Sequence, residues 1–233
     1  MADGLAVVVA AAGTGSRMGG KIKKQFLLLN SKPVLYYSLN VFEEMNLIDE
    51  LVLVAHPQEL DYCQKEIVEK YRFRKVKAVV AGGSTRQQSV WNGLQAVSEN
   101  THIVAIHDGA RPLVTEALFL ALLEEAREWG AAIPGVPVRD TVKMVDGDDF
   151  VVRTLDRSVI MGIQTPQAFN YEELVKAYQM ARDEQFEASD DASLFERYIG
   201  RVKVVPGDYC NLKITTREDL VIAEGLMRFK GGK

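Results

Sequence analysis

The chain has 233 residues, of which 47% are hydrophobic and 26% are charged, close to the average for a globular protein. This composition excludes a disordered, collagen-like or disulfide-stabilised chain, and no apolar run approaches the ~20 residues of a membrane-spanning helix. A net charge of −4 argues against a protein that coats nucleic acid or an anionic membrane, so we expect neither as a partner.

The start of the chain and its cysteine content bear on cellular location. The apolar stretch near the first residue is short and has no basic segment before it, so we expect no secretory signal. Two cysteines, Cys63 and Cys210, are typical of a protein from a reducing compartment. We therefore predict a cytoplasmic protein.

Valine-rich apolar segments alternate with helical segments in the first half of the chain. The apolar segments, typical of strands buried on both faces, lie at 5–11, 50–55, 76–81 and 102–107. The helices are expected to begin at Pro33, at about residue 58, at Ser84 as an N-cap and at Thr115 as an N-cap. This alternation predicts an α/β fold with a mostly parallel sheet and helices on both faces.

After Gly130 the alternation gives way to shorter segments. One more strand is expected at 131–138, and residues 140–157 have the pattern of two extended segments around a DGDD turn. A lone hairpin is marginally stable in water, so this arm, at about 137–160, should cover the sheet edge or reach a second subunit.

The C-terminal part returns to helices and short strands. The expected elements are a helix at 171–185 capped by Asn170, a helix at 189–199, strands at 201–205 and 211–215, and a closing helix capped by Thr216. Neither a repeat nor a Pro- or Gly-rich linker divides the sequence, so we expect one domain, residues 1–233, with the inserted arm.

A basic, glycine-rich loop follows the first predicted strand. Between residues 4 and 42 there is no Asp or Glu, whereas five cations occur there: Arg17, Lys21, Lys23, Lys24 and Lys32. Ligands of parallel α/β sheets bind at the carboxyl ends of the strands, where this loop lies. Small residues beside positive charge favour a polyanion site over a merely solvated basic loop.

Two familiar phosphate-binding motifs nearly match this loop and fail. The third glycine of a dinucleotide fingerprint is displaced by one position to Gly19, and Ile22 stands where a phosphate loop needs a magnesium-binding Ser or Thr. What remains is a glycine-rich turn with Arg17 and Lys24, which suits the roughly four negative charges of a nucleoside triphosphate.

Asp108 follows the strand at 102–107 and should lie at the same sheet edge. A carboxylate near a triphosphate is repelled unless a cation lies between them, so Asp108 is a candidate for Mg²⁺ binding, directly or through water, or for a substrate hydroxyl. The alternative is a helix-capping aspartate paired with Arg111. His107 is expected to be structural, and His56 and His102 fit no metal-site pattern.

Several segments, read together, carry a family resemblance. They are AAGTGSRMG, KKQF, AGGSTRQQSV, HDGARP, PVRDTVK, TLDRS, QTPQAF, DDASLFE and NLKITTREDL, in this order. The set resembles the 2-C-methyl-D-erythritol 4-phosphate cytidylyltransferases (the IspD family), enzymes of non-mevalonate isoprenoid synthesis, from about Leu5 to Leu226. The resemblance implies a Rossmann-like nucleotidyltransferase fold, CTP and methylerythritol phosphate as substrates, and a homodimer whose arms interlock. Mg²⁺ or another divalent cation is the expected cofactor.

The resemblance also implies roles for single residues. Arg17 and Lys24 match stabilisers of the transition state on the triphosphate, and Lys213 matches a lysine that bridges the two substrates. The positions that hold cytosine and ribose are matched by Ala11, Ala12, Gly13, Gly83, Ser84 and Ser89. Arg86 matches a basic residue that orders the base-binding loop, and Asp108 and Arg111 match positions near ribose, metal and sugar phosphate. Thr141 and Arg157 match arm residues that enter the partner's active site.

The implied reaction is an in-line displacement on the α-phosphorus of CTP, which releases pyrophosphate and needs no side-chain nucleophile or general base. Three alternatives stay open. The same chemistry could use ribitol 5-phosphate, although PVRDTVK and TLDRS favour methylerythritol phosphate. An NAD(P)-dependent oxidoreductase is disfavoured by the displaced glycine, and a silent nucleotide-binding regulator is disfavoured by Arg17, Lys24 and Lys213.

Overall fold

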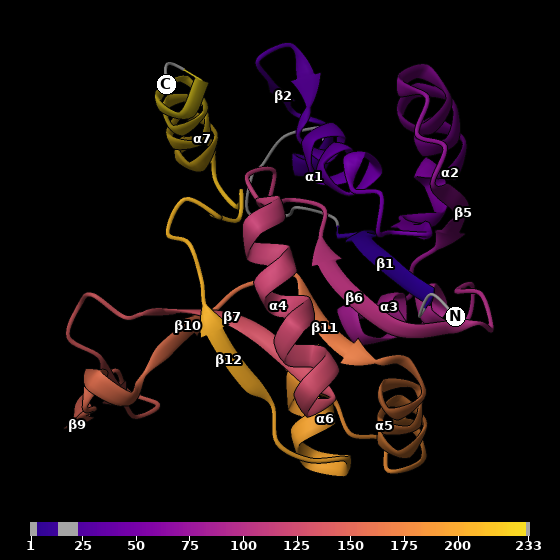
Figure 1. Ribbon diagram of the computed structural model, residues 1–233. Helices are drawn as coiled ribbons and strands as arrows, with labels where there is room; N and C mark the ends of the chain where they lie inside the picture. The colour runs from indigo at the N-terminus through magenta and orange to yellow at the C-terminus, as the bar shows by residue number, and fades with distance from the viewer. Residues whose placement is uncertain (1–3, 14–22, 232–233) are drawn as a thin grey trace.

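The computed structural model describes residues 4–13 and 23–231, and a central sheet with helices on both faces forms its body (Figure 1). The strands of this sheet are β1 (Gly4–Ala11), β4 (Glu50–Ala55), β5 (Val76–Ala81), β6 (Thr101–Asp108), β7 (Ala131–Pro137), β10 (Met161–Ile163), β11 (Gln167–Asn170) and β12 (Lys203–Pro206). Strands β5, β4, β1 and β6 are neighbours in that order and all run parallel. The predicted α/β fold with a mostly parallel sheet is confirmed.

The second half of the sheet is mixed. Strand β11 lies antiparallel between β6 and β7, β10 is also antiparallel to β7, and β12 is parallel to β7. The chain passes from β1 to β4 and β5 on one side and then returns to β6 on the other side of β1. In open α/β sheets, ligands bind where the strand order reverses in this way. The carboxyl ends of β1 and β6 are therefore the expected place for a site.

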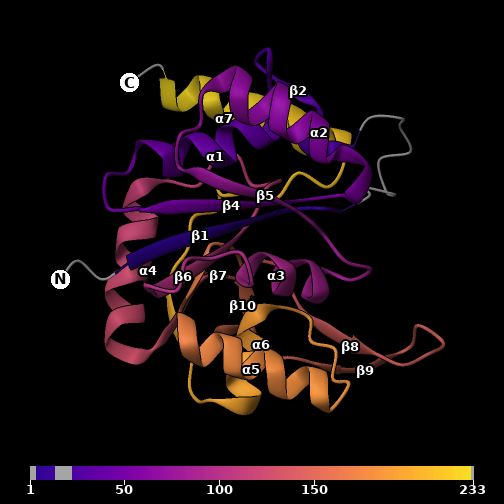
Figure 2. The ribbon, with the colours of Figure 1, turned by 90° about the vertical axis from the view of Figure 1, so that its right-hand side faces the viewer.

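Strand β1 explains why both faces need helices. Leu5, Val7 and Val9 point into one hydrophobic core, whereas Ala6 and Val8 point into the other, and all five are buried. On the first face pack α1 (Val34–Glu44), α2 (Leu60–Tyr62) with the π segment η4 (Cys63–Glu69) that continues it, and α4 (Glu116–Trp129). The 3₁₀ turn η3 (Pro57–Glu59), which precedes α2, has no buried residue. The second face carries α3 (Arg86–Leu94), α5 (Tyr171–Asp183) and α6 (Asp191–Tyr198) (Figure 2).

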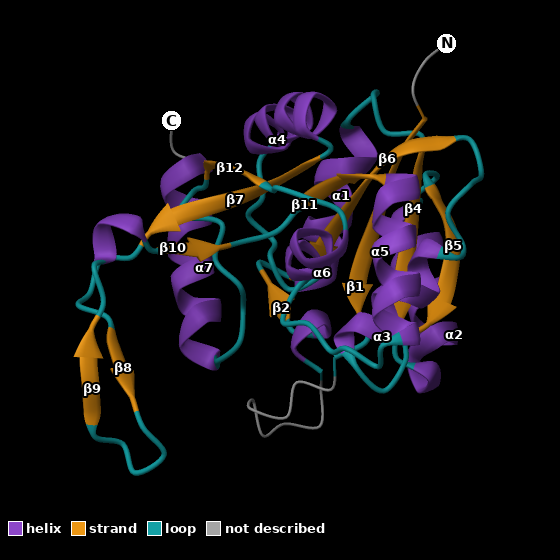
Figure 3. Cartoon of the chain, turned by 90° about the horizontal axis from the view of Figure 1, so that it is seen from below, coloured by secondary structure: helices purple, strands orange, loops and turns teal. Residues whose placement is uncertain are grey.

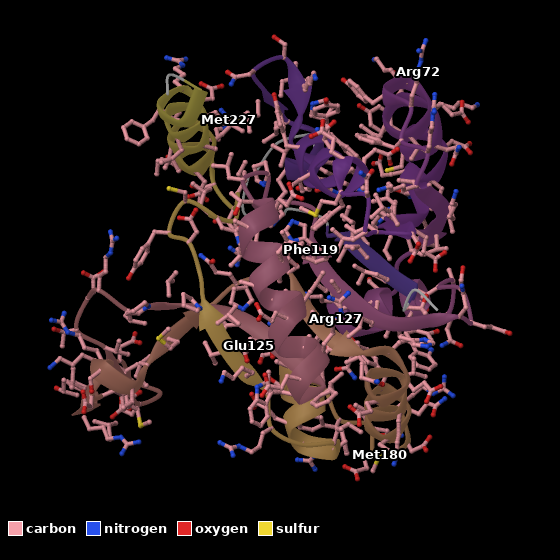
Figure 4. The ribbon with its side chains drawn as sticks, viewed as in Figure 1. Arg72, Phe119, Glu125, Arg127, Met180 and Met227 are labelled. Carbon is pink, nitrogen blue, oxygen red and sulfur yellow. The ribbon has the colours of Figure 1, made fainter. Side chains whose placement is uncertain are left out.

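Aromatic packing fixes the first face. Phe119 of α4 lies on the side of the helix that faces the body (Figure 4), and its ring centroid is 5.2 Å from that of Phe42 of α1. The Phe42 ring also meets the imidazole of His107, 5.2 Å away, in an edge-on contact. The end of β6 that carries the candidate aspartate is thus supported by the rigid core beneath it.

Most helix limits agree with the local signals in the sequence, with two corrections. Thr115 caps α4 as predicted, but Thr85 rather than Ser84 caps α3, because the Thr85 hydroxyl accepts from the Gln88 N–H. Ser84 lies one residue before the cap, where its N–H and hydroxyl donate to the Gln88 side chain. The helix expected over 58–71 is a succession of 3₁₀, α and π turns, with the π segment at Cys63–Glu69.

The arm is a separate two-stranded sheet of β8 (Lys143–Val145) and β9 (Val151–Thr154), which stands away from the body (Figure 3). A short 3₁₀ turn, η5 (Arg157–Val159), follows it. The hairpin exposes a set of large apolar side chains: Met144, Val145, Phe150, Val151 and Val152. Exposed apolar residues gathered on one projecting element are typical of a protein–protein interface.

The C-terminal helix α7 (Arg217–Gly231) packs on a third small core with the short strands β2 (Leu28–Leu29) and β3 (Lys32–Pro33). As predicted, the Thr216 hydroxyl accepts from the Asp219 N–H at the start of α7. The strand predicted at 211–215 is wrong: this segment is an extended loop, bound through the Ile214 N–H to the Ala110 carbonyl. In the described part of the chain no helix is long and apolar enough to cross a membrane.

Two helical glycines give a test of the packing between α3 and the sheet. A Cβ on Gly93 of α3 would lie 2.5 Å from a Val8 methyl and 2.7 Å from a Val54 methyl, whereas a Cβ on Gly225 of α7 would meet nothing within 4 Å. We expect Gly93→Ala to lower the free energy of unfolding by about 1–3 kcal/mol through overpacking. Gly225→Ala should raise it by up to about 1 kcal/mol through helix propensity. Urea unfolding of both variants measures this, and equal effects would contradict the close packing of α3 on β1.

Candidate active site

A cavity of about 500 Å³ opens at the carboxyl ends of β1 and β6, where the strand order reverses. Its walls come from the segment after β1, the turn η2 (Lys24–Phe26), the loop before α3, the end of β6 and the loop before α7. Ten of the residues proposed from the sequence line it: Ala11, Ala12, Gly13, Lys24, Gly83, Ser84, Arg86, Ser89, Asp108 and Lys213.

The carboxylate of Asp108 is the electrostatic centre of this cavity. Asp108 is 7% exposed, and its oxygens lie 2.6 Å from Lys213 Nζ, 3.5 Å from Arg86 Nε and 3.9 Å from Arg111 Nε. Burial alone would raise the pKa of Asp108, but the charges of Arg86 and Lys213 hold that pKa well below its usual range. The Asp108 carboxylate therefore stays ionised near neutral pH, and it faces three cations rather than capping a helix.

A hydrogen-bonded chain fixes the end of β6. The Thr165 hydroxyl accepts from the Asp108 N–H at 3.0 Å and lies 3.2 Å from His107 Nδ1, while His107 Nε2 lies 3.2 Å from the Arg111 carbonyl. Because a carbonyl can only accept, Nε2 carries the proton and Nδ1 accepts from the threonine. His107 is fully buried, and its role is structural, as the sequence indicated.

The loops on either side of the cavity are fixed by buried side chains. The Gln25 amide donates to the carbonyls of Ala11, at 2.7 Å, and Gly13, at 3.3 Å, and so joins the end of β1 to the turn that carries Lys24. Ser89 Oγ accepts from the Gly83 N–H and donates to the Thr85 carbonyl. The Ser89 hydroxyl therefore holds the loop before α3 in its conformation.

Arg86 connects the cavity to the opposite core. Its guanidinium donates to Asp191 of α6 at 2.7 Å, and the other oxygen of this fully buried carboxylate accepts from the Tyr178 hydroxyl at 2.5 Å. Burial would lower the pKa of Arg86, but Asp191 and Asp108 raise it far above its usual value. Arg86 is thus a permanent cation held between two carboxylates, one in the core and one in the cavity.

With this geometry in view, the comparisons with known proteins are decisive. The family model of 2-C-methyl-D-erythritol 4-phosphate cytidylyltransferase (IspD) matches residues 5–229. The chain belongs to the IspD family. It is 46% identical over 224 residues to the 2-C-methyl-D-erythritol 4-phosphate cytidylyltransferase of Caldanaerobacter subterraneus subsp. tengcongensis, covering 96% of this chain and 99% of that one. It also covers 57% of a bifunctional IspD/IspF enzyme of Desulforudis audaxviator, at 49% identity over 97% of its own length.

Solved structures agree with the fold. The 4-diphosphocytidyl-2C-methyl-D-erythritol synthase of Anaerococcus prevotii superposes with a TM-score of 0.85 at 33% identity, covering 97% of each chain. The 2-C-methyl-D-erythritol 4-phosphate cytidylyltransferase of Thermus thermophilus gives a TM-score of 0.79 at 33% identity, with 97% of this chain and 99% of that one covered. The Rossmann-like nucleotidyltransferase fold that the resemblance implied is that of the IspD family.

Three proposed site residues do not line the cavity of this IspD chain, and a fourth lies outside the described residues. Arg111 stands behind Asp108, where it donates to the Asn211 carbonyl at 2.7 Å. Thr141 and Arg157 belong to the arm, where both are exposed. Arg17 lies outside the described residues.

The structure distinguishes the two adjacent lysines of the KKQF segment. Lys23 Nζ forms an ion pair with Glu59 at 3.2 Å, whereas Lys24 lines the cavity. This placement supports the assignment of Lys24, rather than Lys23, to the nucleotide.

Three supporting residues were not assigned from the sequence: Gln25, Tyr178 and Asp191. Gln25 and Asp191 lie within KKQF and DDASLFE, segments that carried the family resemblance, but neither motif indicates which buried group its side chain meets. Tyr178 lies at a core-facing position of α5, where helical spacing indicates burial and gives no sign of a hydroxyl partner.

Burial of His107 makes stability depend on pH. Burial lowers the pKa of His107 to about 4, below the value of about 6.5 usual for histidine. Between these values the unfolded chain binds a proton that folded His107 does not, so the free energy of unfolding falls as pH falls. Across this range the free energy of unfolding changes by about 3 kcal/mol because of His107. This stability is fully present above about pH 6.5 and is lost by about pH 4. In His107→Gln the fall in the free energy of unfolding between about pH 6.5 and pH 4 should be smaller by this amount. Urea unfolding at several pH values measures it. An unchanged dependence on pH would contradict a neutral buried imidazole.

Proposed function

We propose that this chain transfers the cytidylyl group of CTP to 2-C-methyl-D-erythritol 4-phosphate, giving 4-diphosphocytidyl-2-C-methyl-D-erythritol and pyrophosphate. The chain is a cytidylyltransferase of the non-mevalonate pathway, as its near full-length match to the IspD family indicates. The geometric observation that carries the proposal is that Lys24 and Lys213, 189 positions apart in the sequence (213 − 24), line one cavity around the Asp108 carboxylate.

In the reaction, a phosphate oxygen of the acceptor forms a bond to the α-phosphorus of CTP, and the bond from this phosphorus to the bridging oxygen breaks. The electron pair leaves with pyrophosphate. The acceptor phosphate is already ionised near neutral pH, so the site needs fixed positive charge rather than a general base. We assign Lys24 to the triphosphate, together with Arg17, which lies outside the described residues.

Lys213 is proposed to sit between the two substrates. Its ammonium is 2.6 Å from Asp108, yet its side chain is 36% exposed, so one point charge is held in place while facing the cavity. Two phosphate groups must approach each other there, and a fixed cation offsets their repulsion without reorganising. Asp108, which stays ionised, acts as the holder of this ammonium.

A divalent cation fits this cavity as a companion of the nucleotide. Asp108 is the one carboxylate among the described lining residues, and no described group of three or more His, Cys, Asp or Glu is placed to hold a metal. Mg²⁺ commonly binds through one or two carboxylates and the substrate phosphates. We propose that the CTP phosphates hold Mg²⁺, with Asp108 as its protein ligand, directly or through water, and that the ion supplies charge stabilisation to the triphosphate.

The arm supports a homodimer. We propose one nucleotidyltransferase domain with a dimerisation arm at about 137–160. The exposed apolar residues of the hairpin need a partner surface, and Thr141 and Arg157 are absent from the described lining of their own chain's cavity. Both observations are met if the arm reaches the active site of a second copy, where these two residues would contact methylerythritol phosphate.

The acceptor is tested by pyrophosphate release from CTP in the presence of magnesium. We expect turnover with 2-C-methyl-D-erythritol 4-phosphate and a kcat/KM with ribitol 5-phosphate that is lower by at least about 100-fold. A site that forms hydrogen bonds to the hydroxyl groups of one acceptor rejects an acceptor whose hydroxyl groups are placed differently. Faster turnover with ribitol 5-phosphate would reassign the acceptor while leaving the cytidylyl transfer intact.

The two neighbouring lysines provide a matched pair of variants. Lys24→Ala should lower kcat by about 10²–10³, the scale for losing one preorganised charge. Lys23→Ala removes an ion pair with Glu59 outside the cavity and should leave kcat within about twofold, since partly exposed pairs contribute little. Steady-state kinetics with both substrates measure this, and the reverse ranking would show that Lys23 is the nucleotide-binding residue.

Arm exchange is tested by mixing defects in purified mixed dimers. A dimer of one Arg157→Ala chain and one Lys24→Ala chain has one site in which both residues are intact, so we expect about half of the wild-type activity. Each parent homodimer should be nearly inactive. If mixed dimers form and remain inactive, Arg157 does not serve the partner's site.

A further inference from the structure

Tyr209 joins the base of the arm to the body of its own subunit. Its hydroxyl donates to the Pro137 carbonyl at 2.6 Å, and the Arg139 guanidinium lies 3.6 Å from the centre of its ring. Arg157, on the returning strand side, donates to the Arg139 carbonyl. Tyr209 therefore contacts the outgoing side of the arm directly, at Pro137 and Arg139, and the returning side indirectly, through the bond between Arg157 and the Arg139 carbonyl.

The segment that carries Tyr209 is firmly fixed to the body. The preceding residue, Asp208, accepts from the Gln164 amide at 2.9 Å through its carbonyl. The same carbonyl accepts from the Asn211 N–H at 2.8 Å, and the carboxylate accepts from the Cys210 N–H at 2.7 Å. Asn211 is fully buried, and two residues later the chain reaches Lys213 in the cavity. Tyr209 thus extends from a rigid support that is continuous with the active site.

The arm needs such a support. Its roots, residues 138–142 and 155–156, have no regular structure. Residues at the start and end of the arm border, together with Tyr209, a hollow of about 530 Å³. Backbone hydrogen bonds from Val138 to Ile160 and from Leu155 to Val142 join the two roots to each other, and the first of them continues the ladder between β7 and β10. The hydroxyl and ring of Tyr209 add side-chain contacts from the body to Pro137 and Arg139, where the arm leaves this ladder.

We propose that Tyr209 is a positioning residue that sets the direction of its own subunit's arm, and so acts on acceptor binding in the active site of the partner subunit. This inference rests on the arm exchange of the proposed function. An exposed tyrosine with an ordinary surface contact would matter little; here one side chain, 44% exposed, makes two directed contacts to an element whose tip must meet another molecule. A change of angle at the root moves Arg157, which is bonded to Arg139 there, and is amplified towards the tip of the hairpin.

Kinetics of three variants give the first test. Tyr209→Leu removes both contacts, Tyr209→Phe removes the hydrogen bond alone, and Tyr198→Phe is a matched control whose hydroxyl donates to Glu184 on the far face. We expect Tyr209→Leu to raise the KM for methylerythritol phosphate about tenfold or more and Tyr209→Phe to raise it about three- to tenfold, the scale of one hydrogen bond. The KM for CTP and the dimeric state should not change, and the control should match wild type. Wild-type acceptor KM in Tyr209→Leu, or an equal rise in the KM for CTP, would overturn the proposal.

Mixed dimers locate the effect. In a Tyr209→Leu/Lys24→Ala dimer, the site with intact Lys24 receives the arm of the chain with intact Tyr209, so we expect about half of the wild-type activity with a wild-type acceptor KM. A Lys213→Ala/Lys24→Ala dimer, with both changes in the body, should stay inactive. If the Tyr209 dimer keeps the raised KM while the Arg157→Ala/Lys24→Ala dimer recovers, Tyr209 acts within its own site and the proposal is wrong although arm exchange holds. If neither dimer recovers, arm exchange itself is wrong and the proposal falls with it.

Discussion

The rest of the site depends on the interaction of the buried Asp108 carboxylate with the cations around it. Three cations from three separate parts of the chain, Arg86, Arg111 and Lys213, gather around this single carboxylate. Without them, a buried carboxylate would take up a proton, and without the carboxylate, the cations would repel one another. Each group therefore makes the burial of the others tolerable, and only the folded chain brings them together. The result is fixed excess positive charge at a place where a polyanion must bind.

The charge cluster around Asp108 also connects the separate parts of the proposed site. Through Arg86 and Asp191 it is joined to the helices on one face of the sheet, and through Lys213 it is joined to the loop that continues back to Tyr209 and the arm. Arg86 at the start of α3, Lys213 and the root of the arm are thus connected through Asp108 and the loop before α7. A site organised in this way holds its charges in position before the substrates arrive, which lowers the cost of reorganisation during the reaction.

The sequence predicted what local signals control. Valine-rich segments gave the parallel strands within one or two residues, and Thr115 was identified as a cap because its hydroxyl acts within one turn. Ser84 and Thr85 offer the same hydroxyl next to the same helix, so composition alone could not choose between them. The alternation of Leu212, Lys213 and Ile214 resembles a strand, but this segment is held by the Ala110 carbonyl and by buried side chains in place of a ladder.

What the sequence could not predict depends on distant partners. Asp191 meets Arg86 across 105 positions and Tyr209 meets Pro137 across 72, and no spacing rule relates such residues. Gln25 is only 14 positions from Ala11, yet no regular helix or strand spacing brings two residues at that separation together. Ten of the fourteen site residues taken from the family resemblance line one cavity, because the resemblance already contains the fold. The geometry of their ion pairs came from the structure alone.

The most direct test of this account is a double-mutant cycle between Asp108 and Lys213, measured as kcat/KM under conditions in which CTP binding is followed separately. If Asp108 acts mainly by holding the Lys213 ammonium, Asp108→Asn should lower kcat/KM by about 10²-fold in the wild-type background. With Mg²⁺ kept saturating, so that a weaker metal ligand is offset, the same change should cost less than about threefold in a Lys213→Ala background, because the ammonium that Asp108 holds is already absent. CTP binding should persist in all four proteins, since the remaining cations stay in place. Losses that multiply in the double variant would show that the two residues act independently, and the central role of their ion pair would be contradicted.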